Sequence, residues 1–355
     1  VSTIAGSVGN KGSLNGTGTE ANFDNPYFIT SDGSNLYVAD HNNHTIRKIV
    51  ISSGVVTTLA GTSGVSGSND GIGSAAKFNK PTGITTDGTN LYVSEWNNHT
   101  IRKINISSGL VTTFAGTVGV SGTSNGTGTE AKFKNPLGLT TDGMNLFVAD
   151  YGNHMIRKVV ISSGVVTTLA GTAGVSGSID GTGTEAKFKQ PIDLVSVDHN
   201  LYVSTTNHTI RKIVSSNGVV TTLAGTPGSY GYLDGKGTEA KFRSPYGITT
   251  DGTNIYVAGY SNHIIRKVFI SSGVVSTLTG SVSNKGSADG EGNLARFKNP
   301  LGLIMEGSNL FLTDRNNHTI RKINLVGDTV NFRVDFADAA GNSGSVDNTT
   351  DNSLV

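Results

Sequence analysis

His44-Thr45-Ile46-Arg47-Lys48 is the first of six closely similar stretches whose spacing decides the fold. The pattern begins again at five later histidines: His99, His154, His208, His263 and His318. A proline that opens a short apolar run recurs in step with it, at Pro26, Pro81, Pro136, Pro191, Pro245 and Pro300. Both series have a period of 55 residues, with one interval of 54, so six copies of one unit reach to about Leu325.

Each unit predicts four short strands. In the second unit these are Gly83–Thr86, Leu91–Ser94, Thr100–Ile104 and Leu110–Phe114. They are rich in β-branched and aromatic residues, and turn-forming Gly, Asn, Asp and Ser separate them. Because no long stretch has helical periodicity, the chain is predicted to be all-β.

The two ends of the repeat distinguish a closed ring from an open stack. The fourth-strand motif, Val55-Val-Thr-Thr-Leu-Ala-Gly61 in the first unit, is missing after Leu325, and a shorter copy stands at Val1–Gly6. This arrangement is useful only if the N-terminal strand completes the last unit. We therefore predict a closed six-bladed β-propeller of four-stranded blades over residues 1–326, followed by a separate segment over residues 327–355.

The repeated motif resembles a known family. The sequence Pro81-x-Gly-Ile, Asn90-Leu-Tyr-Val and Asn98-His-x-Ile-Arg-Lys103 looks like an NHL repeat, although the third letter of Asn-His-Leu is Thr, Met or Ile here. The resemblance covers all six units and implies a six-bladed propeller. Functions in that family range from protein or RNA recognition and adhesion to lyase chemistry, so the fold does not fix the function.

Composition excludes several classes of protein. The chain has 48 Gly among 355 residues, 15% charged residues, no Cys and a net charge of +1. Disulfide scaffolds and thiol chemistry are excluded, and no bulk positive charge favours nucleic acid. No apolar run approaches the roughly 20 residues that a membrane-spanning helix needs. We predict neither a nucleic-acid partner nor a membrane span.

The residues repeated in every blade are expected to be structural. Arg47 and Lys48, with their equivalents, are interpreted in two ways. Either they form a basic ring that holds phosphates, or the Arg crosses to Tyr37 or Asp40 on the neighbouring strand while the Lys lies at the rim, and we favour the second. The six Asn-His pairs lie too far apart on the ring to share a metal, so no metal site and no cofactor are predicted. Calcium at the loops that begin with Asp70, Asp180 and Asp234 is the alternative.

Positions that vary between otherwise similar blades are the better candidates for a binding face. One is the tip of the turn between the second and third strands: His41, Trp96, Tyr151, Tyr260 and Arg315. Another follows the repeated proline, where Tyr27 and Tyr246 are aromatic, and Asp193 replaces a repeated Gly in the fourth blade. Exposed aromatic residues with a polar rim suit a protein or glycan ligand.

The tail adds a hypothesis about location. Residues 328–336 alternate as a strand does, and Asp338-Ala-Ala-Gly-Asn342 resembles part of a bacterial immunoglobulin-like repeat of surface proteins. The leading hypothesis is a non-catalytic extracellular or cell-surface module for binding, adhesion or assembly, with self-assembly through residues 327–355. No catalytic residue is predicted. The alternative is a lyase or hydrolase with a metal-assisted site at the channel mouth.

Overall fold

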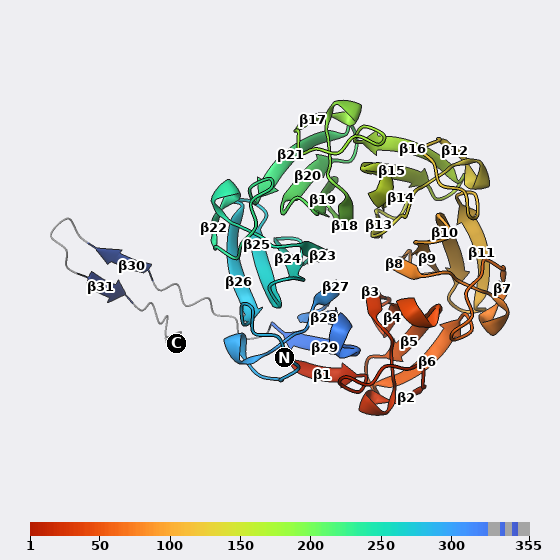
Figure 1. Cartoon of the computed structure of the whole chain (residues 1–355), viewed down its shortest axis with the longest axis horizontal. Helices are drawn as coiled ribbons and strands as arrows, with labels where there is room; N and C mark the ends of the chain where they lie inside the picture. Colours follow the sequence, from red (N-terminus) through yellow and green to blue (C-terminus); the bar gives the residue numbers. More distant parts are fainter. Residues whose placement is uncertain (326–333, 338–342, 347–355) are drawn as a thin grey trace, which may run out of the picture.

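The structure is a computed structural model of the chain and describes residues 1–325, 334–337 and 343–346. Six sheets are arranged around a central axis, and the strands of each sheet follow one another in order from the axis to the rim (Figure 1). The blades follow one another around the ring in sequence order, and neighbouring strands within each blade are antiparallel. The predicted six-bladed propeller is confirmed.

The first three blades have the following strands, from the axis outward. Blade 1 contains β3 (Pro26–Ser31), β4 (Asn35–Asp40), β5 (Thr45–Val50), β6 (Val55–Ala60) and β2 (Gly16–Thr17). Blade 2 contains β8 (Pro81–Thr86), β9 (Asn90–Glu95), β10 (Thr100–Asn105), β11 (Leu110–Ala115) and β7 (Gly71–Ile72). Blade 3 contains β13 (Leu139–Thr141), β14 (Asn145–Asp150), β15 (Met155–Val160), β16 (Val165–Ala170) and β12 (Gly126–Thr127).

The other three blades complete the ring. Blade 4 contains β18 (Pro191–Val197), β19 (Asn200–Thr205), β20 (Ile210–Val214), β21 (Val219–Ala224) and β17 (Gly181–Thr182). Blade 5 contains β23 (Pro245–Thr250), β24 (Asn254–Gly259), β25 (Ile264–Phe269), β26 (Val274–Gly280) and β22 (Gly235–Lys236). Blade 6 contains β27 (Pro300–Glu306), β28 (Asn309–Asp314), β29 (Thr319–Asn324) and β1 (Ser2–Ala5).

The N-terminal strand closes the ring as predicted. β1 pairs antiparallel with β29, with Ser2 opposite Lys322 and Thr3 opposite Arg321. The prediction of four strands in each blade needs a correction, because five of the sheets have a fifth, two-residue strand at the rim. In blade 1 this is β2, whose Gly16 and Thr17 pair with β6. The connection between blades thus covers part of an otherwise open outer edge.

Short 3-10 helices occupy the connections in the described part of the chain. Some precede a blade: η1 (Gly18–Glu20), η3 (Gly73–Ala75), η4 (Gly128–Glu130), η6 (Gly183–Glu185), η7 (Gly237–Glu239) and η8 (Gly292–Leu294). Others form the turn between the second and third strands: η2 (His41–Asn43), η5 (Tyr151–Asn153) and η9 (Arg315–Asn317). In the tail, β30 (Val334–Ala337) pairs antiparallel with β31 (Ser343–Val346). The rest of the predicted tail, including its boundary with the propeller, lies outside the described residues.

The second strand of each blade is buried on both faces, which explains why it lacks a polar face. In β4, Leu36 and Val38 pack in one cluster with Phe311 of blade 6, whereas Tyr37 packs in another with Val93 of blade 2. Successive side chains of a strand point to opposite faces of its sheet. One strand therefore contributes to two layers of core, and the layers join each blade to its two neighbours.

The innermost strands approach one another closely, and this explains the repeated Gly near the axis. A Cβ at Gly83 would overlap the carbonyl oxygen of Leu137 in the next blade. Larger side chains take this place in blades 1 and 4, where Phe28 and Asp193 are buried. Their side chains narrow the channel.

Candidate functional site

Seven of the eight predicted binding residues are brought together at one end of the channel. Tyr27 and Tyr246 are the second residues of β3 and β23, and the tip residues follow the second strands of the blades. The aromatic residues pack on a hydrophobic cluster that includes Leu137, just before β13, and Ile192 and Leu301, near the starts of β18 and β27. We call the seven the mouth cluster: Tyr27, His41, Trp96, Tyr151, Tyr246, Tyr260 and Arg315.

The rings of the mouth cluster contact one another in pairs. Tyr27 stacks on His41 with 4.3 Å between the ring centroids, Tyr246 lies 4.7 Å from Tyr260, and Trp96 lies 5.1 Å from Tyr151. These separations are those of favourable aromatic pairs. All seven side chains are half-buried. The sequence predicted the gathering of these residues but not their pairing.

Arg315 joins two of the pairs. Its guanidinium lies 4.8 Å from the ring centroid of Tyr27 and 5.9 Å from that of Tyr260, and Nη1 donates a hydrogen bond of 2.7 Å to the Tyr260 hydroxyl. A guanidinium placed over tyrosine rings is stabilised by their negative faces. No carboxylate of the described residues forms an ion pair with Arg315.

Several polar atoms of the mouth cluster have no partner within the described residues. The hydroxyls of Tyr27, Tyr151 and Tyr246 and the indole N–H of Trp96 make no hydrogen bond there, yet they are not among the fully buried polar atoms. They therefore reach solvent. Burial is the main cause that raises the pKa of Tyr27 and of Tyr246, so both hydroxyls are protonated at neutral pH and can donate.

His41 is neutral in this setting. Its Nδ1 lies 3.0 Å from the Pro81 carbonyl oxygen, which can only accept, so Nδ1 carries the proton. Burial lowers the pKa of His41 to about 3. His41 thus contributes an uncharged ring that supports Tyr27, and the positive charge of the cluster comes from Arg315.

Asp193, the eighth predicted residue, lies inside the channel and not in the mouth cluster. One carboxylate oxygen accepts a hydrogen bond of 3.0 Å from the Ile248 backbone N–H. Burial raises the pKa of Asp193 to about 7. Its side chain lines a cavity of about 50 Å³ together with residues of all six innermost strands. A water needs about 10–15 Å³ of such volume, so the cavity admits a few waters and no saccharide or peptide.

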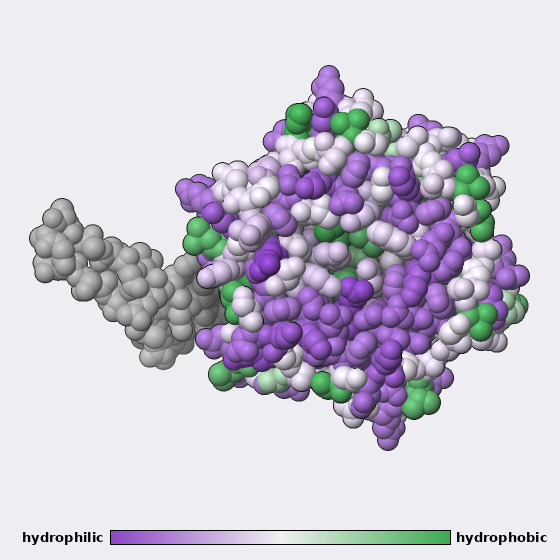
Figure 2. Space-filling view, viewed as in Figure 1, coloured by the Kyte–Doolittle hydropathy of each residue, from purple (hydrophilic) through white to green (hydrophobic). Residues whose placement is uncertain are grey.

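The face that is turned to the viewer in Figure 2 has a central hollow with hydrophobic residues inside it. Hydrophilic residues surround the hollow over most of that face. The narrow cavity beneath restricts any larger ligand to the surface of the propeller. At this end of the propeller, the accessible surface therefore consists of loops and strand ends.

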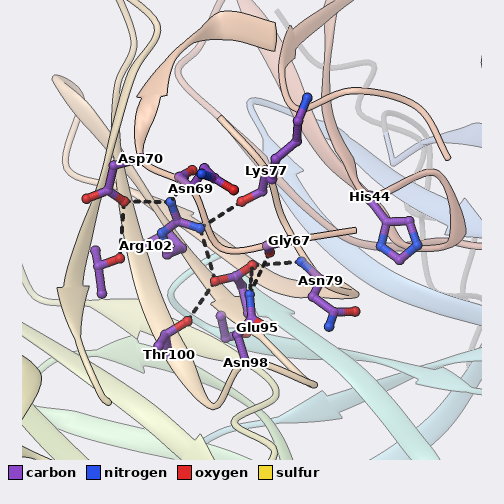
Figure 3. A network of polar contacts seen from close by, with 12 residues as sticks. His44, Gly67, Asn69, Asp70, Lys77, Asn79, Glu95, Asn98, Thr100 and Arg102 are labelled. Atoms are coloured by element: carbon purple, nitrogen blue, oxygen red, sulfur yellow. Dashed lines mark hydrogen bonds and ion pairs between the residues drawn. The ribbon is translucent and has the colours of Figure 1, made fainter. Parts of the chain in front are cut away.

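The repeated arginines are structural. Arg102 is fully buried, and its guanidinium pairs with Asp70 at 2.7 Å and with Glu95 at 3.2 Å (Figure 3). It also donates to the carbonyl oxygens of Lys77 and Asn69. The preferred interpretation, an arginine that crosses to an acid at the position of Asp40, is confirmed by the Arg47–Asp40 distance of 3.0 Å. The arginines do not form a basic ring that holds phosphates, because their side chains are buried.

The sequence did not reveal the second partner of these arginines, which comes from the loop before the blade. Blades 2 and 6 have an acid both there and at the inner position, whereas blades 4 and 5 have the loop acid alone. Blades 1 and 3 have the inner acid and a loop Asn, Asn15 or Asn125. Every buried arginine therefore has at least one carboxylate partner.

This pairing bears on the calcium alternative. In the loops that begin with Asp70, Asp180 and Asp234, one carboxylate oxygen of each Asp is 2.6–2.7 Å from a buried guanidinium. Among the described residues, no three His, Asp or Glu side chains lie close enough to hold a metal ion. We expect 5 mM EDTA to change the melting temperature by less than about 1 °C, measured by circular dichroism. A fall of several degrees that added calcium reverses would show that these loops bind calcium.

The six histidines of the Asn-His pairs connect neighbouring blades, a role that the sequence analysis missed. Each Nδ1 accepts a backbone N–H from the residue before the next repeated proline, as His154 does from Gln190 at 3.0 Å. His318 accepts from Asn25 at 3.2 Å and so joins the last blade to the first. The preceding Asn also reaches beyond its own turn, since Asn43 donates to the carbonyl oxygen of Gly12.

No helix among the described residues has the length and hydropathy that crossing a membrane would require. No family model matches the chain. Its sequence is 28% identical over 334 residues to NHL repeat-containing protein 2 of Gallus gallus, covering 84% of this chain and 46% of that protein. The Homo sapiens protein of the same name is also 28% identical, over 82% of this chain and 45% of its own length. The chain spans about half the length of these relatives.

Solved structures with the same fold include two from Bacteroides thetaiotaomicron. One is a structural genomics protein of unknown function (TM-score 0.69, 23% identity), and the match covers 90% of this chain and 74% of that one. The other is an auxiliary nutrient binding protein (TM-score 0.69, 16% identity, 90% and 75% covered). The relatives and the six-bladed fold together support the NHL-repeat propeller family that the motifs suggested.

Proposed function

We propose that this chain is a non-catalytic binding module that holds a protein or glycan ligand on the mouth cluster. The observation that carries the proposal is the convergence of residues that vary between blades. Around one opening they present aromatic rings together with polar atoms that lack a partner in the described part of the protein. Binding sites commonly combine such rings with a few oriented polar groups.

The enzymatic alternative has less support. A metal-assisted lyase or hydrolase requires several ligands and an acid or base converging on one volume. In the channel cavity, Asp193 is the one titratable side chain of the lining, and the volume of about 50 Å³ is small. We therefore favour binding at the surface over chemistry in the channel.

The proposal includes an extracellular or cell-surface location and a part in adhesion or assembly. This part of the proposal is supported by the composition of the chain, which has no Cys, few charged residues and many Gly. It is also supported by the tail, whose sequence resembles part of a repeat of surface proteins. One similar structure is an auxiliary nutrient binding protein, which fits a module that holds a ligand. Self-assembly through residues 327–355 stays a prediction from the sequence.

Trp96 allows a direct test, because it is the one Trp of the chain and belongs to the mouth cluster. We expect a ligand found on glycan and peptide arrays to change the fluorescence of Trp96. Substitution Tyr151→Ala should weaken the binding of that ligand at least about fivefold, since truncating an aromatic hot-spot residue costs over about 1 kcal/mol.

Met144→Ala is the matched control. Met144 is 73% exposed on the turn after the innermost strand of the same blade, at the opposite end of the channel from Tyr151. This substitution should leave the affinity unchanged. Equal losses in the two variants, or a ligand that leaves Trp96 fluorescence unaltered, would place the binding site elsewhere.

A further inference from the structure

We propose that the mouth cluster binds a saccharide that carries a carboxylate, a uronic acid unit, with Arg315 holding the carboxylate. The inference rests on the proposed function and specifies its ligand class. It starts from the charge of Arg315. Each of the six buried arginines has a carboxylate partner, as Arg102 has Glu95 and Asp70. Arg315 has none among the described residues.

The guanidinium of Arg315 also retains most of its hydrogen-bonding capacity. Of its five N–H groups, one is used by the Tyr260 hydroxyl, and its Nε is buried without an acceptor. A half-buried guanidinium with free donors favours a planar anion, because two parallel N–H groups fit the two oxygens of a carboxylate. The two tyrosine rings beside it hold the guanidinium in place.

The charged residues near Arg315 do not cancel its preference for an anion. Lys80 lies on the same side, where burial is the main cause that lowers its pKa and the Arg315 charge lowers it further. Its Nζ donates 2.6 Å to the amide oxygen of Asn42, and Asp24 is the nearby acid that favours its charge. His41 is neutral. The positive charges of Arg315 and Lys80 outnumber the negative charge of Asp24, so this part of the mouth cluster is positive.

The remaining free groups suit a sugar. The hydroxyls of Tyr27, Tyr151 and Tyr246 and the indole N–H of Trp96 can donate to ring and hydroxyl oxygens. Asn97 follows Trp96 and Asn316 follows Arg315, and the amide oxygens of both asparagines have no partner in the described residues. These neighbouring donors and acceptors suit the hydroxyl groups of a sugar, because each hydroxyl group can both donate and accept a hydrogen bond. The flat aromatic rings beneath them offer apolar contact to a sugar ring.

The test is isothermal titration of the full chain with trimers of galacturonate, glucuronate and mannuronate, each paired with its methyl ester. The ester keeps the sugar and removes the charge. We expect at least one uronate trimer to bind and its ester to bind about 10- to 100-fold more weakly, as the loss of a charge-assisted bidentate contact predicts.

Variants assign the effect to Arg315. Arg315→Gln should remove the preference for the acid over the ester, and Arg315→Lys should keep a part of it, since the charge remains without the planar fork. Arg243→Gln is the matched control, because Arg243 lies over the Tyr230 ring at 5.3 Å outside the mouth cluster. It should bind like the unaltered protein.

Melting curves establish that each variant is folded before its affinity is compared. Equal affinity for acid and ester, or no binding of any uronate trimer, overturns the inference. Binding of tri-glutamate in preference to every uronate overturns it in favour of an acidic peptide. In each of these cases the proposed function stands if another ligand from the arrays changes Trp96 fluorescence, so the two failures are distinguishable.

Discussion

Replacement of Arg102 by methionine is expected to destabilise the propeller by about 3–5 kcal/mol. The side chains of Arg102 and Glu95 are fully buried, so the substitution leaves the Glu95 carboxylate without its counter-charge in the interior. Breaking a buried ion pair on one side has that cost, because an unpaired charge must be kept out of water. Methionine keeps much of the side-chain volume and therefore adds only a small cavity term.

The effect should appear as a lower urea midpoint and as a fall in melting temperature on the order of 5–10 °C for a chain of this size. Arg211→Met is the matched control. Its partner, Asp180, is 48% exposed and can be hydrated after the substitution, and blade 4 has no acid at the inner position. We expect it to cost about 2 kcal/mol less. If both variants lose the same stability, the inner carboxylate is not the cause.

The contrast between these blades explains how the ring tolerates variation. A blade that lacks the inner acid, such as blade 5 with Gly259, has the loop acid Asp234 on its arginine instead. A blade whose loop offers Asn15 has Asp40 at the inner position. Since either carboxylate can compensate the buried guanidinium, the strands remain equivalent while their polar partners change.

The fold could be predicted from the sequence because the motifs that determine it are repeated six times or stand at an end of the chain. The period of 55 residues defined the blades, and the displaced motif at Val1–Gly6 defined the closure. The fifth strands could not be predicted. They are two residues long and rich in Gly, as in β12 (Gly126–Thr127), and form because the connection lies beside an exposed strand edge. That proximity exists only after the blade has folded, because Gly126 pairs with Val166, 40 residues later in the chain.

The candidate site was predictable in part, for a related reason. Variation within constant surroundings identified the residues of the mouth cluster, but the sequence does not contain the radius of the ring, which decides that Tyr246 meets Tyr260 and that Arg315 reaches Tyr27. The same holds for His154, whose partner lies 36 residues later in the next blade. Contacts between blades require the geometry of the whole ring.

The histidine contacts lead to a pH-dependent prediction for His154→Asn. Asn tolerates the left-handed backbone conformation found there, with φ at +62°, but its side chain is too short to reach the next blade. At pH 7.5 the variant should be about 1–3 kcal/mol less stable, because the backbone N–H of Gln190 loses its acceptor. Burial lowers the pKa of His154 in the folded state below its unfolded value of about 6.5.

A lowered pKa fixes the sign of the pH effect. The folded protein binds fewer protons at His154 than the unfolded chain does, so the contribution of this histidine is complete above about pH 6.5. It is lost as the pH falls through the folded pKa, because a protonated Nδ1 cannot accept. The stability difference between the unaltered protein and His154→Asn should therefore shrink toward zero as the pH falls below about 6.5, measured by urea unfolding at each pH. His199→Asn is the control, since His199 has the same φ of +62° and, within the described residues, its ring makes no hydrogen bond to another blade. The stability difference between the unaltered protein and His199→Asn should not change over the same pH range. A His154→Asn difference that grows in acid would mean that the His154 imidazole is protonated in the folded protein.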